Sequence, residues 1–360
     1  MERGKLAMIA VIVIMVAAIA ATVAVNIEEY ERNKPINPDN VTVAACAEHG
    51  IEPFFVAFES GHFLDRGVNV RIIVKESESD VLDSLERKEA EIGAFGTYQF
   101  LHMIDKHGGK YKLVGRFSLE NGTFGATVTD GKYADFKFDG KTSLIGAGIG
   151  VDLDTSFASA VLNYIEKTGQ QDNYVIHAST DTYDSEKINV YDVKDGEIAN
   201  KLSEKEHVDI VVGGAAVVNV VESNTSAFKY VTSYYEYDLD IPVSIYASSD
   251  TYINHSGVVT EVLNGLYDAC SDLAADEGSD EKERSIQICM NNLNVSYAVA
   301  HKYLEITAWS MGYTAGVDKM NIECVFKYSV IINPKEYTDK LSGKDIIDID
   351  PYVYLDCIPE

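Results

Sequence analysis

The sequence predicts an α/β protein of two lobes that follows an N-terminal transmembrane helix. Near the N-terminus lies one long apolar run, and behind it short apolar stretches alternate with amphipathic helical patterns. About 320 of the 360 residues follow that region. A domain usually takes ~100–200 residues, so this length is enough for two lobes with a substantial core.

The apolar run extends from Leu6 to Val25 and is interrupted only by Thr22. About 20 apolar residues in a helix span the ~30 Å hydrocarbon core of a bilayer. Arg3 and Lys5 precede the run, and three glutamates follow it between residues 28 and 31. Basic residues before a span keep the N-terminus inside the cell. The rest of the chain is therefore expected outside the cytoplasm.

We accordingly expect residues 1–27 to form a membrane anchor and residues 28–40 a polar tether. The globular body would then lie on the extracytoplasmic face of the cell membrane. A cleaved signal peptide is the alternative, because Ala18-Ile19-Ala20 is a small-x-small site. The apolar region of a signal peptide is usually only ~7–15 residues long, however, which favours the anchor.

Charge and cysteine content exclude several classes of function. The net charge of −27 argues against binding to nucleic acid and against a basic membrane-binding patch. Five cysteines are too few for a disulfide scaffold, although Cys270 and Cys289 could form a bridge between consecutive helices. The histidines and cysteines lack the spacing of a metal site. We expect no catalytic residue, no metal and no cofactor.

Strands and helices alternate in the first part of the chain. Single helices between strands imply parallel pairing within an α/β layer. Pro53 is expected to open a helix that Gly61 ends, Ser79 to cap a helix, and Thr97 to begin another. The expected strands are Val41–Cys46, Val68–Val74, Glu91–Phe95 and Lys112–Arg116.

A second α/β unit follows, and after it the pattern becomes mainly helical. Its expected strands are Ala126–Thr129, Ser143–Ala147, Tyr174–His177, Ile188–Tyr191 and Val208–Val212. Between them a helix is expected from Phe157 to Lys167. The remaining expected elements are a strand at Val243–Ala247, helices at Gly257–Leu273, Ser285–Leu293 and Tyr297–Glu305, an acidic loop at Asp276–Glu283 and a polar tail from Pro334.

Several stretches occur together in an informative order. They are Phe55–Phe63, Gly67–Val70, Ser79–Leu85, Glu91–Thr97, Asp135–Lys141, Leu144–Gly146, Thr155-Ser156, His207–Val212 and Ile241–Ser248. In this order they resemble the solute-binding proteins of ABC importers in the nitrate, sulfonate and thiamine-precursor class. The resemblance covers roughly Val41 to Tyr313.

This resemblance implies a two-lobed periplasmic-binding-protein-like fold of type II. Lobe 1 would comprise residues 41–120 and 240–360, and lobe 2 residues 121–239. Arg116–Gly125 and Tyr230–Pro242 would be the hinges. The chain would deliver a small organic solute to an ABC permease and its ATPase, without chemistry on the solute. The alternatives are a ligand-sensing surface module, or an enzyme on the same fold such as a thiamine-pyrimidine synthase-like or menaquinone-pathway protein.

Ligands of open parallel sheets bind beyond the carboxyl ends of the strands. The loops expected there, together with one tyrosine near the second hinge, supply the candidate ligand-binding residues. They are Glu48, His49, Phe54, Phe95, Gly96, Thr97, Tyr98, Gly150, Asp152, Thr155, Ser156, Gly213, Gly214 and Tyr235.

The chemistry of these candidates leaves the charge of the solute open. Helix N-termini at Thr97 and Ser156 favour an anion, although both residues could simply be caps. The aromatic residues could stack on a flat ligand or pack in the core. Carboxylates such as Asp152 would repel a sulfonate or nitrate unless His49 or Arg116 compensates, and they would suit an amine or a ring NH.

Overall fold

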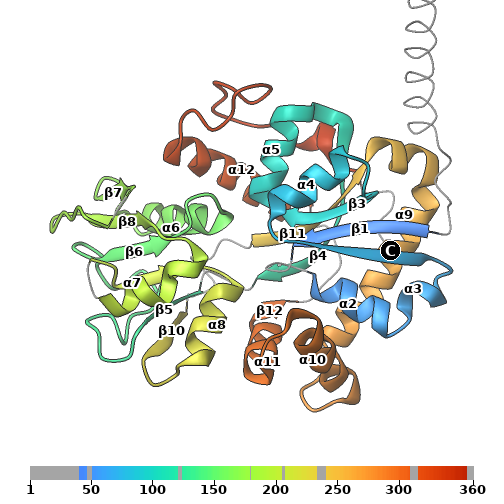
Figure 1. Cartoon of the computed structure of the whole chain (residues 1–360). Coiled ribbons are helices and arrows are strands. Elements are labelled where there is room, and N and C mark those ends of the chain that lie inside the picture. Colours follow the sequence, from blue (N-terminus) through green and yellow to red (C-terminus); the bar gives the residue numbers. More distant parts are fainter. Residues whose placement is uncertain are drawn as a thin grey trace, which may run out of the picture. The chain divides into compact units, whose positions relative to one another are not determined.

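The computed structural model describes residues 40–46, 51–120, 124–178, 180–204, 207–232, 241–308 and 315–354. Within these residues the strands form two six-stranded sheets, each accompanied by helices (Figure 1). The predicted anchor at residues 1–27 and nearly all of the tether lie outside the described residues. None of the helices in the described ranges is both long and apolar enough to span a bilayer.

The described strands of the first sheet are β1 (Asn40–Cys46), β2 (Asn69–Lys75), β3 (Ile92–Gly96), β4 (Tyr111–Glu120), β11 (Ile241–Ser248) and β12 (Thr307–Ala308). Their order across the sheet is β12-β4-β11-β3-β1-β2. β1 and β3 are parallel, as predicted. The predicted parallel pairing does not extend to β4, because β11 lies between β3 and β4 and is antiparallel to both.

β1 is buried on both faces. Val43 packs in the same apolar cluster as Phe54, whereas its neighbour Ala44 belongs to the cluster that contains Phe100. Successive side chains of a strand point to opposite faces, and a strand covered on both sides is apolar throughout. The mostly apolar sequence of this strand, interrupted by Thr42, therefore follows from its position between β3 and β2.

The helices around the first sheet are α2 (Glu52–Glu59), α3 (His62–Asp65), α4 (Glu78–Glu86), α5 (Thr97–His107), α9 (Ser249–Leu273), α10 (Asp280–Leu293) and α11 (Tyr297–Ile306). Pro53 lies in the first turn of α2, as predicted. The prediction that Ser79 caps α4 is wrong. The cap is Ser77, which has an extended backbone and whose Oγ accepts the N–H of Asp80 at 3.2 Å.

The helical C-terminal part of lobe 1 begins earlier than predicted. α9 begins at Ser249 and is kinked at His255, shortly before the predicted start at Gly257. The predicted acidic loop is shorter, because Ser279 caps α10 and its acidic residues form the first turn of that helix. Carboxylates there interact favourably with the positive end of the helix dipole.

The described strands of the second sheet are β5 (Phe124–Val128), β6 (Gly148–Val151), β7 (Tyr174–His177), β8 (Ile188–Asp192), β9 (Ile210–Val212) and β10 (Phe228–Thr232). Their order is β10-β5-β9-β6-β8-β7, and β6 is parallel to both β8 and β9. The helices α6 (Ser156–Lys167), α7 (Ile198–Glu204) and α8 (Ala215–Ser223) belong to this lobe.

The predicted strand at Ser143–Ala147 is wrong, since the strand is β6. Gly146 has φ of +73°, which makes a turn there. Gly148 begins the strand, and a Cβ on it would lie only 1.5 Å from the carbonyl oxygen of His207. The backbone of β6 lies so close to the His207 carbonyl at this point that glycine is required.

The chain passes between the two sheets within the predicted hinge segments. It leaves the first sheet at the end of β4 and enters the second at β5. It returns between β10 and β11. Residues 121–123 and 233–240 in these passages lie outside the described residues.

A long helix absent from the predictions, α12 (Ala315–Ile332), contacts helices of both lobes. It packs against α6 of lobe 2 and α5 of lobe 1. On the α6 side, the carboxylate of Glu166 accepts hydrogen bonds from Lys327 Nζ at 2.6 Å and from the Tyr328 hydroxyl at 2.8 Å. The pKa of Glu166 is lowered by these two hydrogen bonds, which stabilise its ionised form.

The chain after α12 is bound to α5 by a buried carboxylate. Asp105 is only 3% exposed. Its two oxygens accept the backbone N–H groups of Thr338, Asp339 and Leu341 at 2.7–3.2 Å. A second carboxylate, that of Glu336, lies 2.7 Å from the Tyr98 hydroxyl and 2.8 Å from His102 Nε2.

We expect Asp105→Ala to lower the free energy of unfolding by at least ~4.5 kcal/mol, because three backbone donors each lose a hydrogen bond to a charged group that contributes ~1.5–3 kcal/mol. Urea unfolding measures this loss. Lys106→Ala, at the next and exposed position, is the matched control and should change stability by under ~0.5 kcal/mol. Equal stability of the two variants would contradict the role of Asp105.

Glu91 should make stability depend on pH. Its Oε2 accepts the Thr42 N–H at 2.7 Å, and burial raises the pKa of its carboxyl above 4.5. The folded state then holds this proton more tightly than the unfolded state, so stability increases as pH falls from 7 towards 4.5. Glu91→Gln keeps the acceptor and removes this increase. Urea unfolding at several pH values measures the free energy of unfolding of the wild type, of Glu91→Gln and, as a control, of Glu89→Gln at an exposed position. If the free energy changes with pH in the same way in wild type and Glu91→Gln, the assignment to Glu91 is wrong.

Candidate functional site

Three helices begin at the carboxyl ends of strands, where the candidate residues were predicted. α5 follows β3, α6 follows β6, and α8 follows β9, each within a few residues. Burial raises the pKa of Tyr98 in α5 most, its hydrogen bond to Glu336 contributes next, and the charge of Asp154 adds to both. α5 belongs to lobe 1, whereas α6 and α8 belong to lobe 2.

The N-terminus of α5 already holds a carboxylate of the protein. Gly96 is its N-cap residue, and the Gly96 N–H donates to Glu78 Oε1 at 2.7 Å. Thr97 lies at the first helical position and does not cap the helix. Thr97 is 0% exposed, and its hydroxyl has no hydrogen-bond partner among the residues that the structure describes. Glu78 takes the position that an anion would occupy at this helix N-terminus.

Two aspartates of the loop between β6 and α6, together with one at the end of β8, surround a lysine that follows β8. Lys194 Nζ lies 2.7 Å from Asp152, 2.7 Å from Asp154 and 3.2 Å from Asp192. Burial lowers the pKa of Lys194, but the hydrogen bonds to Asp152 and Asp154 outweigh it and raise the pKa overall. The four side chains together carry an excess of negative charge.

Among the described residues, the cation beside these carboxylates is Lys194, whereas the sequence suggested His49 or Arg116 for this role. Arg116 is buried within β4. Glu48, His49 and Tyr235 lie outside the described residues. Lys194 comes 40 residues after Asp154 in the chain. Only the parallel pairing of β6 with β8 brings the two together.

Thr155 and Ser156 begin α6. Thr155 is the N-cap residue, but its Oγ1 donates to the carbonyl oxygen of Asp152 at 2.7 Å instead of accepting a helix N–H. Ser156 follows at the first helical position and is 6% exposed. The backbone N–H groups at the N-terminus of α6 therefore lie next to the cluster of aspartates around Lys194.

The candidate glycines differ in their setting. Gly150 lies inside β6, and the side chains of Val193 and Val208 fill the space beside it. Gly213 and Gly214 connect β9 to α8, and Gly214 is the N-cap residue of α8. The backbone of these last two glycines therefore lies at a strand end.

Two of the candidate aromatic residues are core residues. Phe54 and Phe95 are both 0% exposed. The Phe95 ring stacks on Tyr246, with ring centroids 4.3 Å apart. These rings contribute to the core through burial and stacking. Tyr98 is half-buried, and its hydroxyl is bound by Glu336.

The predicted bridge between Cys270 and Cys289 is wrong, because both are thiols. Each is buried in the apolar cluster between α9, α10 and α2, and burial raises the pKa of both. Apolar packing thus accounts for both side chains. In the described ranges, no group of three or more His, Cys, Asp or Glu side chains is arranged to hold a metal ion.

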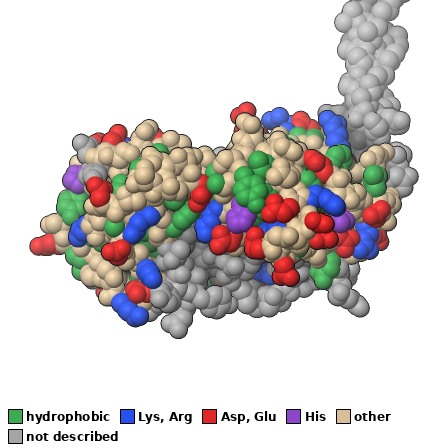
Figure 2. All heavy atoms as spheres, turned by 90° about the horizontal axis from the view of Figure 1, so that it is seen from below, with side chains coloured by type: hydrophobic (Ala, Val, Ile, Leu, Met, Phe, Trp, Pro, Cys, Tyr) green, Lys and Arg blue, Asp and Glu red, His purple; other side chains and the backbone are tan. Residues whose placement is uncertain are grey.

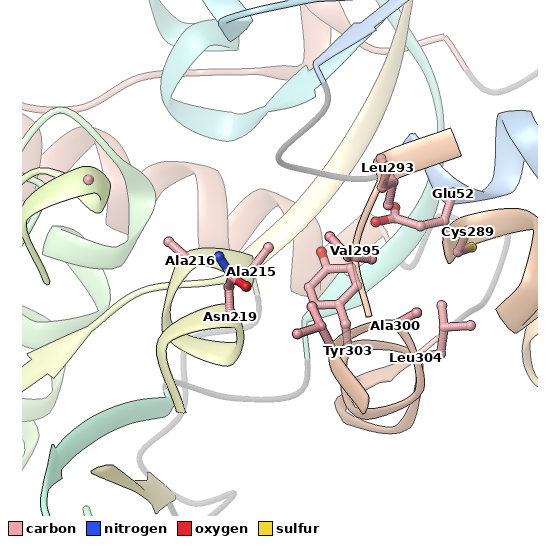
Figure 3. A pocket seen from close by; sticks show the side chains of 12 residues that line it. Glu52, Ala215, Ala216, Asn219, Cys289, Leu293, Val295, Ala300, Tyr303 and Leu304 are labelled. Carbon is pink, nitrogen blue, oxygen red and sulfur yellow. The ribbon is translucent and has the colours of Figure 1, made fainter. Parts of the chain in front are cut away.

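A cavity of about 320 Å³ lies between α8 of lobe 2 and α10 and α11 of lobe 1. Figure 3 shows Ala215, Ala216 and Asn219 on one side of it. Glu52 and Tyr303 line the opposite side. Most of the wall is apolar. The described lining residues are Glu52, Gly196, Ala215, Ala216, Asn219, Cys289, Leu293, Val295, Val299, Ala300, Tyr303 and Leu304.

The sequence did not point to this cavity. Its α8 wall follows directly after Gly213 and Gly214, which were predicted, but the other wall comes from helices that read as ordinary amphipathic segments. One signal for the cavity was present in the sequence. Glu52, at the start of α2, is a carboxylate among apolar residues next to a predicted ligand loop.

The fold is similar to those of solved ABC-import binding proteins. The periplasmic aliphatic sulphonate binding protein SsuA from Escherichia coli has a TM-score of 0.65 at 11% identity, over 88% of this chain and 92% of that one. The ligand binding component of an ABC-type import system from Staphylococcus aureus scores 0.61 at 9% identity, over 89% and 97%. The periplasmic nitrate-binding protein NrtA from Synechocystis PCC 6803 scores 0.59 at 10% identity, over 82% and 85%.

No protein-family model and no curated protein sequence matches the chain. At these identities the structural similarity establishes the fold. The chain has the α/β, two-lobed periplasmic-binding-protein-like fold of type II, which confirms the fold that the sequence resemblance implied.

We expect Thr97→Val to leave the free energy of unfolding unchanged, or to raise it by up to ~1 kcal/mol, because it replaces a buried hydroxyl that has no partner within the described ranges with a methyl group of similar shape. A melt of each variant tests this. Ser77→Ala is the comparison, since it removes a working cap and should lose ~1 kcal/mol. A similar loss in Thr97→Val would show that its hydroxyl stabilises the helix.

Proposed function

We propose that this protein is the extracytoplasmic solute-binding component of an ABC importer. It captures a small organic solute between its two lobes. The observation that supports this most directly is the two-lobed fold, because α5 of lobe 1 and α6 and α8 of lobe 2 each begin at the carboxyl end of a strand, and ligands of such sheets bind in the space beyond these ends. A solute that contacts both lobes binds the closed state better than the open one, so binding shifts the population towards closure.

The solute would contact groups on both sides of this space. On lobe 1 these are the Thr97 hydroxyl and Tyr98. On lobe 2 they are the loop from Asp152 to Ser156 and the backbone at Gly213 and Gly214. The lobes would divide as residues 41–120 with 240–360, and 121–239, with hinges at Arg116–Gly125 and Tyr230–Pro242. The two passages of the chain between the sheets support these bounds.

The apolar run at Leu6–Val25 would hold the protein at the cell membrane, and the permease and ATPase of the importer would be its partners. The surface agrees with a soluble body that does not bind nucleic acid. On the face drawn in Figure 2, acidic and basic side chains are interspersed. The net charge of −27 would repel a polyanion. Delivery of a solute requires no chemistry, so no enzymatic role is proposed.

We expect some small solute to raise the melting temperature and to make the protein more compact. A thermal-shift screen with sulfonates, oxyanions, amino acids, pyrimidines and amines finds the binder, and a concentration ~100 times its dissociation constant should add ~2.7 kcal/mol of stability. Small-angle scattering with and without the binder then measures lobe closure. Binding without any change in the radius of gyration would contradict capture by closure.

A further inference from the structure

We propose that α12 is a strap that stays fixed to lobe 1 and separates from α6 of lobe 2 when the lobes open. The helix lies between α5 of lobe 1 and α6 of lobe 2 (Figure 1). Lobes that move apart must break one of these two contacts, because packed interfaces switch between discrete arrangements and do not stretch. The proposal rests on the proposed function only in taking the lobes to open and close.

The face of α12 that meets α6 carries several polar groups. Cys324 Sγ donates to Asn163 Oδ1 at 3.7 Å, and Ser159 Oγ donates to the carbonyl oxygen of Val325 at 3.5 Å. Asn321 shares this face of α12 with Cys324 and Val325, since residues three and four apart lie on one side of a helix. Separating this face from α6 exposes less apolar surface than separating a face of leucines and isoleucines would.

Two buried amides of this interface have no hydrogen-bond partner among the described residues. They are the Nδ2 groups of Asn163, which is 8% exposed, and of Asn321, which is 2% exposed. A buried donor without a partner raises the free energy of the closed arrangement, because it has lost its hydrogen bonds to water. Opening the interface returns both amides to water, so opening costs less than the buried area alone would suggest.

One carboxylate holds the rim of this interface. Glu166 of α6 accepts hydrogen bonds from Lys327 Nζ at 2.6 Å and from the Tyr328 hydroxyl at 2.8 Å. The side chains of Lys327 and Glu166 are 47% and 46% exposed. An ion pair that is this accessible to water contributes little to stability. The rim contact can therefore break and form again as the lobes move.

The opposite face of α12 is bound to lobe 1 through the chain that follows it. Ser329 shares a hydrogen bond of 2.8 Å with the Tyr337 hydroxyl, and the Tyr337 ring packs on His102 of α5 with centroids 5.4 Å apart. The Asp105 carboxylate of α5 then accepts the N–H groups of residues 338, 339 and 341. Ser329, Tyr337 and Asp105 are all at most 5% exposed. These contacts are buried and hydrogen-bonded, so α12 stays with lobe 1.

The same segment supports a residue that the proposed function assigns to the solute. Glu336 accepts a hydrogen bond from the Tyr98 hydroxyl at 2.7 Å and lies 2.8 Å from His102 Nε2. A strap that moved with lobe 2 would withdraw Glu336 from Tyr98 at every opening. A strap that is fixed to lobe 1 keeps Tyr98 in place to receive the solute.

Thiol labelling of the full-length protein in detergent, without solute, tests the proposal with one reporter on each face of α12. Cys324 is the native reporter on the α6 face. Burial raises the pKa of its thiol to about 11, so the thiol reacts slowly while the interface is closed. Ser329→Cys in a Cys324→Ser chain puts the reporter on the lobe 1 face. Peptide mass spectrometry after labelling with iodoacetamide distinguishes each reporter from the other cysteines.

We expect Cys324 to be labelled at least about tenfold faster than the Ser329→Cys reporter, because local opening is more frequent than global unfolding. Cys270, a buried thiol in the core of lobe 1, is the internal reference for global unfolding. The Ser329→Cys reporter should react as slowly as Cys270. If Ser329→Cys fails to fold, the rates of Cys324 and Cys270 in the unaltered chain give the comparison.

A second pair of variants tests whether opening limits the labelling. Glu166→Gln weakens the rim contact and should speed the labelling of Cys324 by about threefold or more. Glu89→Gln is the matched control. It breaks a comparable ion pair on lobe 1, in which Lys75 Nζ lies 3.3 Å from Glu89, and should leave the rate at Cys324 unchanged.

The proposal is overturned if the Ser329→Cys reporter is labelled as fast as Cys324, since α12 would then leave lobe 1 as well. It is also overturned if Cys324 reacts as slowly as Cys270, or if Glu166→Gln leaves the rate at Cys324 unchanged. In each case, a solute from the screen that binds and compacts the protein leaves the proposed function standing. If labelling follows these expectations and no solute binds, the proposed function fails and the strap remains.

Discussion

The contact between the Asp105 carboxylate and the backbone of residues 338–341 is what returns the end of the chain to lobe 1. α12 packs on α6 of lobe 2, where Glu166 binds Lys327 of α12. The Asp105 contact directs the residues that follow α12 back to lobe 1. Because three donors meet one carboxylate, this segment has little freedom. The two lobes therefore share a helix, and any closure must be absorbed on the α6 side of α12 or in the turn that follows it.

Most strands and helices could be predicted because their signals are local. A buried strand such as β1 is mostly apolar, and Pro53 opens α2 as prolines commonly do. The position of β11 between β3 and β4 could not be predicted, since pairing over that separation is decided by the whole sheet. α12 was missed for a related reason. It touches α5 and α6 together, so its apolar residues do not form a single stripe.

The candidate site was predicted less completely, because side chains from distant parts of the chain complete it. Asp152 and Ser156 lie in one loop and could be found by their spacing. Lys194 reaches them only through strand pairing, and Glu78 reaches Gly96 only because α4 packs against β3. Acidic residues supply many of these internal contacts in a chain with 57 acids and 30 bases. The distribution of charge around these strand ends depends on such non-local contacts, which explains why the loops alone left the charge of the solute open.

The central place of β11 also has a consequence for the order of folding. β3 and β4 have no direct pairing with each other, and the strand that joins them begins only at Ile241. Lobe 2, by contrast, draws all its described strands from one continuous stretch, 124–232. During synthesis or passage through a membrane, the second lobe is thus complete first. The first sheet stays open, with unpaired strand edges exposed, until more than two thirds of the chain has emerged.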